Sequence, residues 1–388
     1  MLMRKKFTKF MLMAACAWPL TSMGGPRYAL TVLGGADSAA LDINQSGQVV
    51  GQYTNADGAQ RAFLHSGGVL QDLGTLGGNS SSATAINNGG QIVGVADNGD
   101  GYGRAFSYAH GVMSDLGTLG GLSSRAYGLD NDGHIVGSAD TPEGEIGQYG
   151  AAFLLSGGVM TNLGFLPTYE GDEMSRALAI NGHGLVVGAS SATLFGPPEH
   201  PEHAFTYTGG VLTDLGTFGG LYSAARSIND GGVIVGQAST TLDPAGIGHT
   251  VPHAFMYIHG MMIDLGALGD EYDGSDAHDV NNLDDIVGST GIRGSDGPHG
   301  FLYQAGVLQD LNNLIDSASG WVVTSAAAIN DGRQIAATAC RVNLCYAVRL
   351  DPLVAEVPEP GAAFLTATGL ALLAGVILRR RSRQFSRS

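Results

Sequence analysis

The phrase DLGTLGG stands at residues 72–78 and again, unchanged, at residues 115–121. Near copies follow along the chain: NLGFLP from Asn162, DLGTFGG from Asp214, DLGALGD from Asp264 and DLNNLI from Asp310. Each copy needs similar surroundings, so we expect the chain to repeat one structural unit along most of its length.

Two further phrases recur in phase with the first. The phrase INxxGxIVG, or a variant of it, begins at Ile43-Asn44, Ile86-Asn87, Leu129-Asp130, Ile180-Asn181, Ile228-Asn229, Val280-Asn281 and Ile329-Asn330. Successive copies lie 43, 43, 51, 48, 52 and 49 residues apart. The phrase AFxY, or a variant, begins at Ala62, Ala105, Ala152, Ala204, Ala254 and Gly300. A period of about 40–50 residues is typical of propeller blades with four strands each.

One unit, residues 83–119, contains four short apolar runs separated by turn signals. ATAIN and QIVGVA are joined by NNGG, whose first Asn and last Gly suit a type I turn. RAFSY and VMSDLG are joined by AHG, which predicts a tight hairpin. No helical periodicity appears, and glycine is abundant at 61 residues. We therefore expect all-β units of four antiparallel strands, and a parallel β-helix, the main alternative, is disfavoured.

The two ends of the repeat predict how the ring closes. Residues 28–35, YALTVLGG, match a fourth strand and its loop without the three strands that should precede them. At the other end, AAAIN, RQIAATAC and CYAVRL supply strands one to three before the pattern stops at Asp351. We therefore predict a closed seven-bladed β-propeller over residues 25–351, with residues 28–33 as the closing strand of the last blade.

Basic residues are concentrated at the ends of the chain. All three lysines lie in the first ten residues and five of the sixteen arginines lie in the last ten. The middle carries ten arginines against nearly all of the 35 acidic residues. Because phosphate contacts need clustered Lys and Arg, no nucleic-acid partner is expected.

The first 24 residues have a basic start, an apolar run and then small residues, which predicts a secretory signal helix. Cleavage after Ala17 and cleavage near residues 22–25 both stay open, and MAAC ending at Cys16 is faintly similar to a lipoprotein box. Residues 361–378 carry no charge and would span a membrane as one helix of about 27 Å. The cluster Arg379, Arg380 and Arg381 should then stay in the cytoplasm, with the body outside.

The C-terminal end closely resembles the PEP-CTERM sorting signal of Gram-negative bacteria. Within residues 357–388, Val357-Pro358-Glu359-Pro360 is followed by the apolar span and the arginine cluster, and residues 352–356 form a linker. The resemblance implies recognition by an exosortase, a membrane enzyme thought to cleave near Pro-Glu-Pro. It also implies transfer from the inner membrane to the cell surface or the exopolysaccharide matrix.

The repeated phrases themselves resemble the HAF repeat of bacterial extracellular proteins. HAF stands at residues 203–205 and 253–255, PHGF stands at residues 298–301, and Arg61 and Arg104 replace the histidine in the first two copies. The resemblance covers almost the whole body. It implies an extracellular repeat protein without a defined catalytic activity.

Histidines are the best metal candidates in the sequence. His200-x-x-His203 and His249-x-x-x-His253 precede the third strand of adjacent units, and two such pairs could meet at one Zn²⁺. Equivalent points on neighbouring blades are usually too far apart for one ion, however. Because His203, His253 and His299 fill the slot before AF, we favour a structural pairing with an Asp and expect no metal and no cofactor.

Other candidate sites are weaker. The GTLGG run lacks the Lys and the following helix of a phosphate-binding loop. DNGDG (residues 97–101) and DEYDGSD (residues 270–276) are rich in oxygen ligands but lack EF-hand spacing, so solvated turns are favoured over Ca²⁺ sites. Neither G-x-S-x-G nor H-E-x-x-H occurs, so no catalytic residue is predicted.

Cys340 and Cys345 remain once Cys16 leaves with the signal. They flank residues 341–344 between the second and third strands of the last blade, where facing Cα atoms lie near the separation of about 5.5 Å that a disulfide prefers. In an exported protein we therefore predict a disulfide that staples this hairpin.

Together these features predict an exported, non-enzymatic repeat protein of the cell surface or extracellular matrix. Its expected role is adhesion, or binding of a glycan or protein on the face that carries the variable loops. The alternative is a secreted propeller enzyme, a polysaccharide lyase or hydrolase. In that case carboxylates, Arg and His should converge at the central channel.

Overall fold

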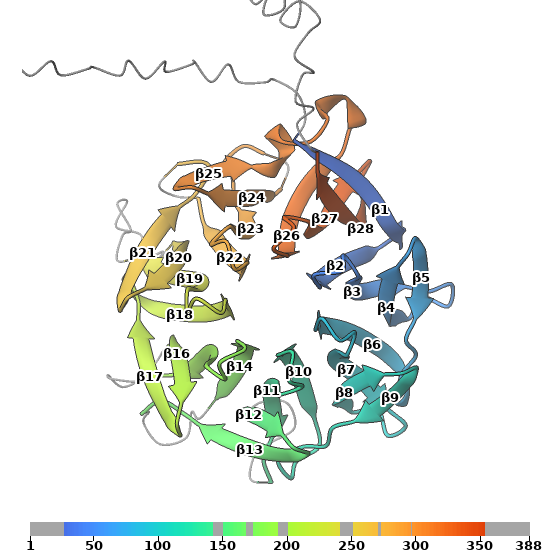
Figure 1. Ribbon diagram of the computed structural model, residues 1–388, viewed down its shortest axis with the longest axis vertical. Coiled ribbons are helices and arrows are strands. Elements are labelled where there is room, and N and C mark those ends of the chain that lie inside the picture. The colour runs from blue at the N-terminus through green and yellow to red at the C-terminus, as the bar shows by residue number, and fades with distance from the viewer. Residues whose placement is uncertain are drawn as a thin grey trace, which may run out of the picture.

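The computed structural model describes residues 27–142, 150–167, 174–192, 201–240, 251–270, 273–295 and 297–353. Their strands form seven four-stranded antiparallel sheets around a ring, an all-β seven-bladed propeller as the repeat predicts (Figure 1). Helical structure in this part is limited to the 3-10 turns Leu311–Asn313 and Ser317–Ser319. None of the described helices is long and apolar enough to cross a membrane. The predicted signal helix and C-terminal membrane helix lie outside the described residues.

Blades 1 to 6 each use four consecutive strands, with the first nearest the channel. Blade 1 has β2 (Ser38–Ile43), β3 (Val49–Thr54), β4 (Gln60–Ser66) and β5 (Val69–Asp72). Blade 2 has β6 (Gly77–Ile86), β7 (Ile92–Asn98), β8 (Gly103–Ala109) and β9 (Val112–Asp115). Blade 3 has β10 (Ser124–Leu129), β11 (Ile135–Asp140), β12 (Gly150–Ser156) and β13 (Val159–Gly164). Blade 4 has β14 (Ser175–Ile180), β15 (Val186–Ser191), β16 (Glu202–Thr208) and β17 (Val211–Gly216). Blade 5 has β18 (Gly219–Ile228), β19 (Ile234–Thr240), β20 (Pro252–Ile258) and β21 (Met261–Gly266). Blade 6 has β22 (Ser275–Val280), β23 (Ile286–Thr290), β24 (His299–Gln304) and β25 (Val307–Asp310).

Blade 7 is built from both ends of the described chain, as predicted. Its strands are β26 (Val322–Ile329), β27 (Ile335–Arg341), β28 (Leu344–Pro352) and, outermost, β1 (Tyr28–Ala36). The register of β1 on β28 places Tyr28 opposite Pro352 and Val32 opposite Val348. Figure 1 shows β1, in blue, alongside the red strands that end the propeller. Pairing of the first strand with the last joins the two ends of the repeat in one blade and so closes the ring.

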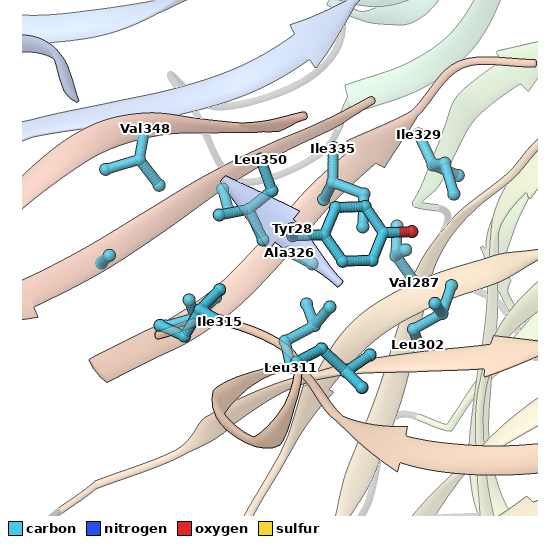
Figure 2. Close-up of a cluster of buried hydrophobic side chains, with 14 residues drawn as sticks. Tyr28, Val287, Leu302, Leu311, Ile315, Ala326, Ile329, Ile335, Val348 and Leu350 are labelled. Carbon is cyan, nitrogen blue, oxygen red and sulfur yellow. The ribbon is translucent and has the colours of Figure 1, made fainter. Parts of the chain in front are cut away.

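The closing strand also contributes to the largest buried cluster. Tyr28 is only 4% exposed and lies among aliphatic side chains of blades 6 and 7 (Figure 2). Leu302 and Leu311 come from the blade 6 side of this cluster, and Ile335 and Leu350 come from blade 7. Burial of apolar side chains therefore stabilises ring closure in addition to the hydrogen bonds between β1 and β28.

The repeated phrases are copies of one hydrogen-bond network. In the first copy, Ser81 Oγ accepts the Ala62 N–H at 2.9 Å and donates to the Gly74 main-chain oxygen at 2.6 Å. Asp72 Oδ1 accepts the Gly74 N–H at 2.7 Å. The same hydrogen bonds recur, for example, around Ser223. They link three segments: the AF phrase of one blade, the DLG phrase that follows it, and the inner strand of the next blade. The repeated phrase DLG is thus a blade-to-blade crossing.

The glycine of IVG is required by close approach of the inner strand. A Cβ on Gly94 would overlap the main-chain oxygen of Ser82 and lie 2.9 Å from the Phe106 ring. Blade 7 departs from this pattern, because Ala337 stands where the other blades have glycine and Val348 replaces the phenylalanine. The smaller Val348 faces Ala337 across the strand pair, so the two changes offset each other in volume.

The propeller has two distinct faces. The loop face carries the DLG crossings and the loops between the second and third strands of each blade. The turn face carries the INxxG turns and the hairpins between the third and fourth strands. Arg27 and Leu353 meet at the turn face, where the Leu353 N–H donates to the Arg27 oxygen at 2.8 Å.

Candidate functional site at the channel mouth

Two adjoining cavities open on the loop face beside the central channel. The larger, of about 590 Å³, is lined by residues of blades 3, 4 and 5. The smaller, of about 260 Å³, lies between blades 3 and 4. Tyr127 and Arg176 line both cavities, so we treat them as one site, the channel-mouth groove. Its principal polar and aromatic side chains are Arg125, Tyr127, Arg176, Glu202, Tyr222 and Arg226.

Bulges in the inner strands place several of these side chains. The pairing register shifts between Ala126 and Gly128, and the equivalent shift in blade 5 falls between Ala225 and Ser227. The extra residues are Tyr127 and Arg226, and both line the groove. A bulge re-aims the side chain of its unpaired residue, so the repeat supplies a variable position beside the channel in each blade.

Two of the groove arginines are held by carboxylates. Arg176 Nη2 lies 2.5 Å from Glu202 Oε2. Arg226 makes a two-point contact with Asp276, from Nε at 2.7 Å and from Nη2 at 2.6 Å. Such paired groups have fixed orientations and still present unused donors and acceptors to a ligand. Tyr222 is 40% exposed and adds an aromatic surface to the same groove.

His278, the bulge residue of blade 6, lies beside this arginine–carboxylate pair. Its Nδ1 is 2.9 Å from the Ala326 main-chain oxygen, which can only accept, so Nδ1 carries the proton. Its Nε2 lies 3.4 Å from Ser289 Oγ and 3.8 Å from Asp276 Oδ2. In the neutral ring Nε2 then carries no proton and can accept the Ser289 hydroxyl hydrogen. Carboxylate, Arg and His thus converge at the channel, as the enzyme alternative requires.

The opposite mouth of the channel, at the turn face, is lined by a ring of asparagines around a cavity of about 180 Å³. Each side-chain amide donates to the main-chain oxygen of the equivalent residue in the next blade, at 2.9 to 3.2 Å, from Asn44, Asn87, Asn181, Asn229, Asn281 and Asn330. Blade 3 has Asp130 at this position, and its carboxylate has no N–H group that could donate this hydrogen bond. The ring is therefore interrupted between blades 3 and 4.

The interruption coincides with a group of possible metal ligands. Asp130, Asp132 and His134 offer ligand atoms within 4.8 Å of one another, the one such group among the described residues. His134 Nδ1 already bonds Asp130 Oδ2 at 2.6 Å. The sequence-based search missed this group because it belongs to a variant INxxG turn rather than to a recognised motif.

Two half-buried carboxylates stand in the inner strands near the turn face. Asp42 accepts the Ile86 N–H of the next blade at 2.7 Å, and Asp279 accepts the Ile329 N–H at 2.9 Å. Burial, reinforced by the charge of Asp279, raises the pKa of Asp42 to about 8. Burial also raises the pKa of Asp279. These groups tie neighbouring blades together.

The predicted histidine candidates lie apart from the groove. His203 Nδ1 bonds Asp214 at 2.8 Å, and His253 Nδ1 bonds Asp264 at 2.9 Å, each within its own blade. The His299 ring bonds Asp310 in the same way at 2.8 Å. Burial alone would raise the pKa of Asp214, but hydrogen bonds from His203 and the Gly216 N–H outweigh it and lower that pKa. His200 and His249 lie outside the described residues.

The other predicted positions fall in three places. Cys340 and Cys345 form a disulfide at the end of the β27–β28 hairpin. In the 97–101 segment Asn98 Oδ1 accepts the Asp100 N–H at 3.0 Å, and Gly101 donates to the Asn98 oxygen at 3.1 Å, which makes this segment a turn. The sorting motif Val357 to Pro360 and the arginines 379 to 381 lie outside the described residues.

The groove residues were not singled out in the sequence, although a signal existed. Within the phrase that ends in IN, most positions hold the same small or aliphatic residues in each copy. The second, fourth and fifth positions vary instead. The second and fourth supply Arg125, Tyr127, Arg176 and Arg226 of the groove, and the fourth also supplies His278 beside it. Positions at which a repeat departs from its own pattern are the ones free to carry function.

Comparisons with known proteins identify the fold. No family model matches the chain, and no curated protein is significantly similar to it. The propeller domain of the Trilobed protease from Pyrococcus furiosus, described as having an open velcro topology, superposes with a TM-score of 0.52 at 9% identity, over 84% of this chain and 100% of that one. A puromycin-hydrolyzing peptidase from Mycobacterium tuberculosis gives a TM-score of 0.51 at 12% identity, over 84% of this chain and 54% of that one.

These neighbours contradict the prediction that the chain is not an enzyme, because both are peptidases or parts of one. Absence of a familiar nucleophile motif is a poor guide in a propeller, where reacting groups come from several blades. At 9 and 12% identity the resemblance itself establishes the fold alone. It does not transfer peptidase activity to this chain.

Proposed function

We propose that the protein is an exported propeller of the cell surface or extracellular matrix that binds polysaccharide in the channel-mouth groove. The groove carries the proposal because it combines aromatic rings with oriented, paired charges in one cavity. Sugars present hydroxyl groups that both donate and accept hydrogen bonds, and C–H faces that pack on aromatic rings. Tyr127 and Tyr222 offer such rings, and the Arg176–Glu202 pair offers donors and acceptors.

Export follows, in this proposal, from the N-terminal signal and from the PEP-CTERM-like tail handled by an exosortase. The position of the termini supports it, since Arg27 and Leu353 meet at the turn face while the groove opens on the loop face. A chain held through residues 357–388 would present the groove away from its point of attachment. The Cys340–Cys345 disulfide also suits an oxidising compartment.

Binding is tested with the exported protein and a panel of neutral and acidic bacterial polysaccharides in isothermal titration. The variants Tyr222→Ala and Arg226→Gln should weaken binding about tenfold, or about 1.4 kcal/mol. Gln60→Ala, an exposed substitution near the loop face of blade 1, should leave it unchanged. If no polysaccharide binds, or if the groove variants bind as tightly as the wild type, the proposal fails.

Sorting is tested separately, by intact mass and localisation in cells with and without an exosortase. We expect a shortened, surface-exposed product only when the exosortase is present. A tail retained in both strains would remove the sorting part of the proposal and leave the binding part standing.

Catalysis on the bound polysaccharide is a second candidate function, favoured by His278. Its Nε2 carries no proton in the neutral ring and lies 3.8 Å from Asp276, which is paired with Arg226. A base near such a charged pair can remove a proton from carbon or activate water. Depolymerisation would be followed by viscosity and by new chain ends. We expect His278→Gln to abolish turnover while binding is retained; turnover equal to the wild type would exclude His278 as the base.

A further inference from the structure

Arg125 differs from the other arginines of the groove. It is the second residue of β10, its side chain is exposed, and it lines the smaller cavity with Tyr127 and Arg176. Arg176 and Arg226 are each neutralised by a carboxylate. Arg125 makes no hydrogen bond or ion pair with any residue of the described ranges.

Acidic residues outnumber arginines in the body of the protein. Of its 35 acidic residues only Glu356 and Glu359 lie beyond residue 353, and ten arginines stand against the others in the body. Most of these arginines form an ion pair with a carboxylate, as Arg104 does with Asp115 and Arg349 does with Asp351. Arg125 has no carboxylate partner among the described residues, and its guanidinium lines a cavity together with a second arginine, Arg176.

A second guanidinium faces the same cavity from the next blade. Arg176 occupies in β14 the position that Arg125 occupies in β10, so the two flank the cavity of about 260 Å³. The Nε of Arg176 is enclosed and has no hydrogen-bond partner among the described residues, although its Nη2 binds Glu202. Asp140 also lines this cavity, and its Oδ2 already accepts the Ser123 N–H at 3.1 Å. The cavity thus combines two guanidinium groups with one carboxylate that is engaged by the main chain.

We infer that the polysaccharide is acidic and that one of its carboxylates binds Arg125 in the cavity between blades 3 and 4. The inference rests on the proposed function and narrows its ligand class. A planar carboxylate matches the two-point donor geometry of a guanidinium better than a hydroxyl group does. Tyr127, which lines both cavities, would lie between the charged group and the part of the chain that enters the larger cavity.

The test compares each acidic polysaccharide with a carboxyl-reduced form of the same backbone. Oligosaccharides of polygalacturonate, alginate and xanthan would be used, with dextran as a neutral chain. We expect at least one acid to bind about tenfold more tightly than its reduced form, with the difference shrinking as salt rises. The variant Arg125→Gln should lose this preference, and Arg125→Lys should restore part of it.

The matched control is Arg61→Gln, an arginine of blade 1 that is the second residue of β4, near the same face and outside the groove. It should keep both the affinity and the preference for the acid. Binding of dextran or of reduced chains as tightly as the acids, or unchanged acid binding by Arg125→Gln, would overturn the carboxylate site and leave the proposed function intact. If neither acidic nor neutral chains bind, the proposed function itself fails and the inference fails with it.

Discussion

Asn330 of blade 7 donates its side-chain amide to the main-chain oxygen of Asn44 in blade 1, at 3.0 Å and across 286 residues of chain. The bond joins the last blade to the first within the asparagine ring at the turn face. It is made by residues near opposite ends of the repeat. The same side chain accepts the Gln334 N–H at 2.9 Å, so it also fixes its own turn.

Replacing Asn330 by Ala should therefore destabilise the whole propeller. The change leaves buried main-chain groups without partners, which costs about 1–3 kcal/mol. Chemical unfolding followed by circular dichroism would measure it. Gln60→Ala, on an exposed strand end, should cost less than about 0.5 kcal/mol. Equal stability of the two variants would show that the ring contributes nothing.

Closure of the ring by β1 predicts a large effect of Tyr28→Ala. The Tyr28 side chain is 4% exposed within the buried cluster of blades 6 and 7, so we expect a loss of about 3–5 kcal/mol in the free energy of unfolding. Val32→Ala, in the same strand but 41% exposed, is the control and should cost under about 1 kcal/mol. A protein that lacks residues 27–33 yet melts like the full body would disprove closure altogether.

The glycine of the IVG phrase gives a steric prediction. A Cβ on Gly236 would overlap the main-chain oxygen of Ala224 in the neighbouring strand, so Gly236→Ala should destabilise by about 3 kcal/mol. Gly99 has open space around its Cβ position and no left-handed backbone, and Gly99→Ala should be neutral. Thermal unfolding of both variants would decide; a harmless Gly236→Ala would mean that the inner strand can shift.

The half-buried Asp42 predicts a dependence of stability on pH. Its pKa of about 8 lies above that of the unfolded chain, so the folded state keeps a proton that the unfolded chain releases. Stability from this group is complete at low pH and falls between about pH 4 and 8, by at most about 1.4 kcal/mol per unit. The variant Asp42→Asn, similar in shape to the protonated acid, should flatten this slope.

The measurement is the free energy of unfolding at intervals from pH 5 to pH 8. Asp57→Asn, on an exposed turn, should keep the wild-type slope. An unchanged slope in Asp42→Asn would mean that Asp42 does not hold a proton in the folded state.

Much of this architecture can be predicted from the sequence because several copies of one pattern indicate the same structural unit. The copies anchored at Ile43-Asn44 through Ile329-Asn330, and the unmatched strand that begins at Tyr28, define both the number of blades and the closure. Each repeated Ser, Asp and Gly makes the same hydrogen bonds or close contacts in its own blade, as Ser81 does with Ala62 and Gly74. These residues recur because their partners are near in sequence or one repeat away.

Only the tertiary structure decided which side chains meet at the channel. Arg226 and Asp276 are 50 residues apart, and Tyr127 shares a cavity with Arg176 because bulges and blade packing turn both toward the groove. A single sequence records the variation at these positions but not their convergence. The reason is that the groove depends on the angle between blades and on strand register, which the whole ring sets. The sequence alone thus determined the repeated unit and its closure, while the folded ring determined the site.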